Sequence, residues 1–102
     1  MRVFALSAAL LLAAAPATAD VTVEVGHNHI TPAKVTIKKG ESVTFHNVDE
    51  MPGGHTVAAE DGSFQSPPLA KDQDFTHKFE SSGTVKVKIL QHPKATGEII
   101  VE

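Results

Sequence analysis

Apolar and polar residues alternate with a period of two along most of this chain, and that alternation is the feature that most restricts its fold. The pattern begins at 21–25, where three valines are separated by Thr22 and Glu24. Further strands are expected at 34–38, 42–46, 55–59, 75–79, 85–89 and 99–101, with turn residues between them. No stretch shows a convincing helical repeat. About seven short strands separated by turns predict an all-β protein, an antiparallel sandwich or a small barrel.

The composition excludes several kinds of site. The 102 residues include no Cys, which rules out disulfides, zinc–thiolate sites, iron–sulfur clusters and a cysteine nucleophile. Twelve acidic and nine basic residues give a formal charge of -3, which argues against a nucleic-acid partner. No serine lies in a nucleophile elbow and no glycine loop has phosphate-binding spacing, so we expect no enzyme. Six histidines carry most of the remaining chemical information.

Residues 1–19 have the features of a secretory signal peptide. Arg2 supplies the positive charge, residues 4–15 are apolar, and Ala17-Thr18-Ala19 fits the small-residue cleavage pattern. The apolar stretch is too short to span a bilayer, so no membrane span is expected after cleavage. We therefore expect an exported, periplasmic protein with one folded domain, residues 20–102.

Most of this domain shows a family resemblance. It rests on Ile30-Thr31-Pro32 followed by residues 35–47, on His55-Thr56-Val57, on residues 83–87 after Phe79, and on His92-Pro93 followed by residues 97–101. In this order and at these spacings the chain resembles the cupredoxins, the plastocyanin- and amicyanin-like family of small exported copper proteins. The resemblance implies a Greek-key β-sandwich. It also implies that His55 and His92 are copper ligands at one end of that sandwich.

Two family ligands are missing from the chain. The copper loop of the resembling family has a Cys three residues before its second His and a weakly bound Met three residues after it. Those positions are Ile89 and Ala95 here. The alternation along the strand agrees with this placement, because every second residue shares a face and Ile89 therefore lies on the inward face with Val85 and Val87. A thiolate defines the blue-copper site, so the resemblance implies the fold without a type 1 copper centre.

Two further histidines and a methionine could complete a copper site of another kind. His27 and His29 lie in a segment that, in the resembling fold, passes the end of the sandwich where His92 emerges. In a strand, an x-His-x-His alternation places both side chains on one face. Met51 precedes His55 in the same loop, and its thioether favours Cu(I), whereas imidazole suits copper, zinc and nickel. The expected metal ligands are therefore His27, His29, Met51, His55 and His92.

The other histidines are expected to have structural roles. His46 falls on the polar face of its segment and is expected to face solvent. His77 lies between Phe75 and Phe79 on the buried parity, which is typical of a core histidine. By the same resemblance, Asn47 is expected to brace the His55 loop through hydrogen bonds to the backbone.

These observations predict a periplasmic cupredoxin-like protein that binds, buffers or delivers copper in copper homeostasis or tolerance. The expected ion is Cu(II) or Cu(I), and the expected protein partner is a periplasmic cuproenzyme or copper transporter. The leading alternative is a cupredoxin-fold interaction module that holds no metal. Electron transfer is less favoured because the thiolate is absent, and a zinc-assisted hydrolase is less favoured because nothing marks a general base. A metal-bridged dimer remains open.

Overall fold

The computed structural model describes residues 21–50 and 52–102. The signal peptide predicted for residues 1–19 and the predicted ligand Met51 lie outside the described residues. The described residues form eight strands. Their bounds are β2 (Val21–Val25), β3 (Ile30–Thr31), β4 (Lys34–Ile37), β5 (Ser42–Asn47), β6 (Val57–Ala59), β7 (Asp74–Lys78), β8 (Gly83–Ile89) and β9 (His92–Val101). Within these ranges the chain forms no helix that is long and apolar enough to cross a membrane.

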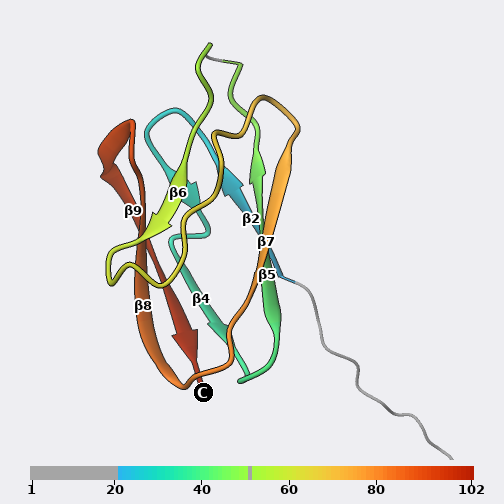
Figure 1. Ribbon diagram of the computed structural model, residues 1–102, viewed down its shortest axis with the longest axis vertical. Helices are drawn as coiled ribbons and strands as arrows, with labels where there is room; N and C mark the ends of the chain where they lie inside the picture. Colours follow the sequence, from blue (N-terminus) through green and yellow to red (C-terminus); the bar gives the residue numbers. More distant parts are fainter. Residues whose placement is uncertain (1–20, 51) are drawn as a thin grey trace, which may run out of the picture.

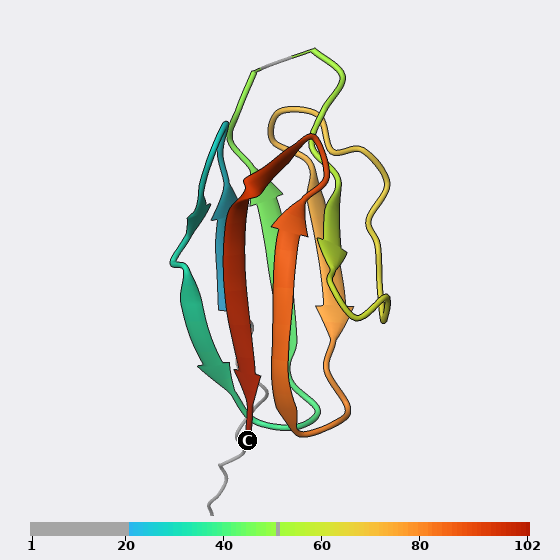
Figure 2. The ribbon, with the colours of Figure 1, turned by 90° about the vertical axis from the view of Figure 1, so that its left-hand side faces the viewer.

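The strands form two four-stranded sheets that face each other, which confirms the predicted β-sandwich. One sheet has the order β3-β2-β5-β7 and the other has the order β4-β9-β8-β6. Figure 2 looks onto the second sheet, with the first behind it. Four of the neighbouring pairs are antiparallel, whereas β2–β5 and β4–β9 are parallel, so the prediction of an antiparallel sandwich was wrong in strand direction. The sheets are therefore mixed, because the chain changes sheet between β3 and β4 and returns to the first sheet with β5.

The core lies between the two sheets and is built by the alternation seen in the sequence. In β5, Val43, Phe45 and Asn47 point inward and are fully buried, while the residues between them are half-buried. Each fully buried Val, Ile or Phe side chain contributes about 1.5–3 kcal/mol of transfer free energy. Phe64, in the segment between β6 and β7, packs against Phe45 at a ring-centroid distance of 5.9 Å. The loops at the ends of the sandwich are therefore attached to a closely packed core.

Three connecting segments gather at the end of the sandwich opposite the C-terminus (Figure 1). They are residues 26–29 between β2 and β3, residues 48–50 and 52–56 between β5 and β6, and residues 90–91 between β8 and β9. These segments meet because β2, β5 and β8 all end at this end of the sandwich. Residues from distant parts of the chain are therefore brought together at this end.

Candidate metal centre

Three of the predicted ligands meet at this end of the sandwich. One ring nitrogen from each of His27, His55 and His92 lies within 4.8 Å of the other two. The ring centroids are 4.4 Å apart for His27 and His92, and 5.2 Å apart for His55 and His92. Within residues 21–50 and 52–102 this is the only group of three or more His, Cys, Asp or Glu side chains with such close ligand atoms. We refer to these three residues as the His cluster.

The β2–β3 hairpin supplies His27 but turns His29 away. The connection is closed by a hydrogen bond of 2.9 Å from the Gly26 N–H to the His29 carbonyl. The His29 ring lies directly over Gly26, in space that a Cβ atom would occupy. His29 is therefore not part of the His cluster. The alternation that suggested one shared face applies to an extended strand, whereas residues 26–29 form a turn.

His55 is the buried member of the His cluster, with only 1% of its surface exposed. Its backbone forms two hydrogen bonds with Leu69, of 3.0 and 2.9 Å. Its Nε2 atom lies 2.8 Å from a carboxylate oxygen of Asp49. Its Nδ1 atom is buried and has no hydrogen-bond partner among the described residues. An unsatisfied buried polar atom costs about 1–3 kcal/mol, so its retention suggests a further partner such as a metal ion.

A tight turn before His92 fixes that residue relative to His55. The Gln91 side chain accepts a hydrogen bond from the Thr56 N–H at 2.7 Å and donates one to the Thr56 hydroxyl at 3.0 Å. The Leu90 N–H also donates to the Thr56 carbonyl at 2.9 Å. Because Thr56 directly follows His55, these three bonds hold the segment before β6 against the turn between β8 and β9, beside His55 and His92. The His cluster is thus largely preorganised.

Asp49 belongs to an acidic pair, Asp49-Glu50, whose loop position predicts solvent exposure or, less favourably, hard oxygen ligands, yet it contacts two members of the His cluster. The oxygen that bonds His55 also lies 3.2 Å from Nδ1 of His27. The Asp49 N–H donates to the Asn47 side chain at 2.9 Å, and that side chain donates to the Leu69 carbonyl at 2.6 Å. The predicted bracing role of Asn47 is confirmed by these two bonds to backbone groups. No motif marks Asp49 in the sequence, since an acid in a polar loop usually faces water.

The inner side of the site is closed by aliphatic groups. Ile89 is fully buried and Ala95 is 2% exposed, so the two residues that the resemblance places at the missing ligand positions are both part of the core. His27, in contrast, has 48% of its side chain exposed. The donor set therefore consists of three imidazoles that face the outer end of the sandwich, and it fits copper, zinc or nickel. It does not fit a type 1 copper centre, which needs a thiolate.

The remaining histidines lie outside the His cluster. His46 is half-buried on the outer face of its sheet, where a hydrogen bond with Asp74 raises the pKa of its imidazole. His77 stacks on Phe64 at a ring-centroid distance of 4.3 Å, and its burial lowers the pKa of its imidazole. His77 is half-buried rather than fully buried because β7 lies at the edge of its sheet.

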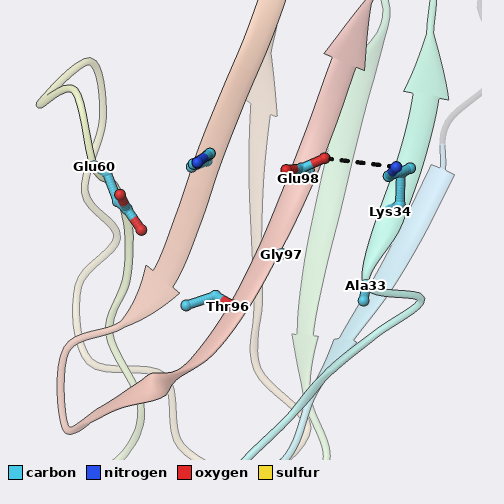
Figure 3. A pocket seen from close by; sticks show the side chains of 7 residues that line it. Ala33, Lys34, Glu60, Thr96, Gly97 and Glu98 are labelled. Atoms are coloured by element: carbon cyan, nitrogen blue, oxygen red, sulfur yellow. Dashed lines mark ion pairs between the residues drawn. The ribbon is translucent and has the colours of Figure 1, made fainter.

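One surface depression has a lining that includes none of these ligands. It has a volume of about 400 Å³ and lies over β4, β8 and β9. Its charged lining residues include Lys34 and Glu98, which form an ion pair of 3.9 Å (Figure 3). No histidine lines it. An open, charged depression on a sheet face has neither the enclosure nor the convergent donors of the His cluster, so we place the candidate site at the loop end.

Comparisons with known proteins agree with this architecture. No family model matches the chain. Amicyanin from Paracoccus versutus is 36% identical over 99 residues, covering 89% of this chain and 72% of that protein. A purple cupredoxin from Nitrosopumilus maritimus superimposes with a TM-score of 0.72 at 26% identity, covering 80% of this chain and 99% of the other. A Met-to-Ala mutant of amicyanin in the Cu(I) state gives 0.70 at 28% identity, covering 80% and 81% of the two chains.

The mixed two-sheet sandwich with histidines at one end defines the class as cupredoxin. The chain belongs to the cupredoxin family, and amicyanins are among its relatives. It differs from the ligand pattern described above in having no cysteine at all.

Proposed function

We propose that this protein binds a copper ion through His27, His55 and His92 and that it binds, buffers or delivers copper in the periplasm. The observation that carries the proposal is the buried Nδ1 atom of His55, which has no partner within the described chain and lies beside two other imidazoles. Neutral imidazole is a good ligand for copper, and the preference of nitrogen sites for Cu(II) over other divalent first-row metals adds to the argument. The Cu(I) state of the amicyanin mutant supports the same metal.

The proposed site is a non-blue one. Three imidazoles with an oxygen or water ligand suit Cu(II). Met51 lies in the same loop as His55, and we keep its thioether as the proposed additional donor for Cu(I). His29, which lies next to the His cluster in sequence, would have to leave its place over Gly26 to join the site.

Exposure across the His cluster suggests how an ion enters and leaves. His55 is buried at the base, His92 is half-buried, and His27 is exposed. An incoming ligand from another protein would therefore replace His27 or His92 before His55. This order suits a carrier that passes copper by ligand exchange to a periplasmic cuproenzyme or transporter, without catalysis by the carrier itself.

Copper affinity of matched histidine variants tests the proposal. The measurement is competition with a chromophoric chelator for the unaltered protein, for the His55→Ala/His92→Ala double variant and for His46→Ala, a histidine outside the His cluster. We expect the double variant to lose the specific site and His46→Ala to keep it. Equal affinity in all three proteins would reject the site and favour an interaction module that holds no metal.

A further inference from the structure

We propose that Asp49 is a positioning residue that selects which nitrogen each of two imidazoles presents to the metal. The inference rests on the proposed function, because it concerns the same His cluster. One carboxylate oxygen, Oδ2, lies 2.8 Å from Nε2 of His55 and 3.2 Å from Nδ1 of His27. The two imidazoles thus meet the same acceptor through chemically different nitrogens.

This contact fixes the tautomers of both rings. An ionised carboxylate only accepts hydrogen bonds, so each nitrogen that bonds it carries the proton. A neutral imidazole has a single N–H, and its other nitrogen then has the free lone pair. His55 is therefore the Nε2–H tautomer with its lone pair on Nδ1, and His27 is the Nδ1–H tautomer with its lone pair on Nε2. The absence of a described partner for the buried Nδ1 atom of His55 agrees with this assignment.

Asp49 is itself held in place by buried groups. Its side chain is only 16% exposed, although it lies in a loop. Its backbone N–H bonds the fully buried Asn47, which in turn bonds the carbonyl of Leu69. Leu69 pairs with the backbone of His55. These bonds form a closed circuit from Asp49 back to the ring that it orients, so the carboxylate is fixed relative to the His cluster.

A carboxylate placed behind a metal-binding imidazole fixes the orientation of the ring and raises its basicity. Loss of such a group usually lowers metal affinity by about 10–100-fold. Here one carboxylate bonds two of the three imidazoles, so its removal should change the orientation and basicity of both rings. The neighbouring Glu50 provides a matched control, because it carries the same charge and its side chain is 81% exposed.

The first test is ¹⁵N NMR of the histidine rings in the full, metal-free protein near pH 8, where an ordinary imidazole (pKa about 6.5) is neutral. We expect the Nε2–H tautomer for His55 and the Nδ1–H tautomer for His27. In Asp49→Ala we expect both assignments to become mixtures and copper affinity to fall by about 10–100-fold. Glu50→Ala should change neither.

Two results would overturn the proposal. One is a proton on Nδ1 of His55 in the unaltered protein, which can be seen even if Asp49→Ala fails to fold. The other is a folded Asp49→Ala variant with unchanged tautomers and unchanged copper affinity. Failure of the proposed function looks different: the tautomers would respond to Asp49→Ala as expected, while the unaltered protein would bind no copper through its histidines.

Discussion

The family resemblance places Ile89 where a cupredoxin has its copper-binding cysteine, and Ile89→Cys tests that placement. The side chain is fully buried at the end of β8, opposite Val57 on one side and His92 on the other. Truncation of a buried Ile to Ala costs about 2–5 kcal/mol, and a thiol fills part of that space, so we expect a loss of about 1–3 kcal/mol. In a domain of this size that loss lowers Tm by roughly 4–24 °C.

Copper should then distinguish this variant from an ordinary destabilised one. The new thiolate beside His55 and His92 would complete the two-imidazole, one-thiolate set of blue-copper sites. We expect a strong visible absorption band on addition of Cu(II), together with partial recovery of Tm through ligand binding. Val87→Cys is the control, since Val87 is equally buried on the same face of β8 but pairs with Ala59 and Gly97. A folded Ile89→Cys protein without colour, or equal colour in both variants, would refute the placement.

Three further predictions concern the supports and the charges of the molecule. Gln91→Ala removes two side-chain hydrogen bonds to Thr56, so thermal melts should show a loss of about 0.5–1.5 kcal/mol per bond, and competition assays should show weaker copper binding. The bond with Asp74 raises the pKa of His46 in the folded state, so protonated His46 stabilises the fold below about pH 6.5 and this contribution is lost as pH rises through the raised pKa. Chemical denaturation should therefore show that Asp74→Asn destabilises the protein more near pH 5 than near pH 9, and an equal effect at both would contradict this sign. Copper affinity should fall as pH decreases from neutral to acidic conditions, because imidazole must be neutral to bind, and a flat affinity profile would argue against histidine ligands.

The β-sandwich was predictable because alternation reports which face of a strand is buried. Val23 and Val25, for example, are both fully buried as their parity predicts. Strand direction was not predictable, since the same alternation fits a parallel or an antiparallel neighbour. The two-residue strand β3 was also missed, because it exists through its pairing with β2 rather than through a pattern of its own.

The His cluster was only partly predictable. His55 and His92 were suggested by the resemblance, and His27 by the path expected for its segment. His29 could not be separated from His27, because the spacing alone does not reveal the turn that the Gly26–His29 hydrogen bond closes or the position of the His29 ring over Gly26. The contacts of Asp49 with the imidazoles could not be predicted, because the contact with His27 joins positions 22 residues apart in the chain. Met51 remains a prediction.

The most direct test of the central claim is electron paramagnetic resonance during a Cu(II) titration of the protein. We expect one bound Cu(II) ion with hyperfine coupling to three imidazole nitrogens and only weak visible colour. We also expect His27→Ala to remove one of these couplings and His29→Ala to leave the spectrum unchanged. A spectrum without nitrogen coupling, or one that His27→Ala does not alter, would contradict copper binding by the His cluster.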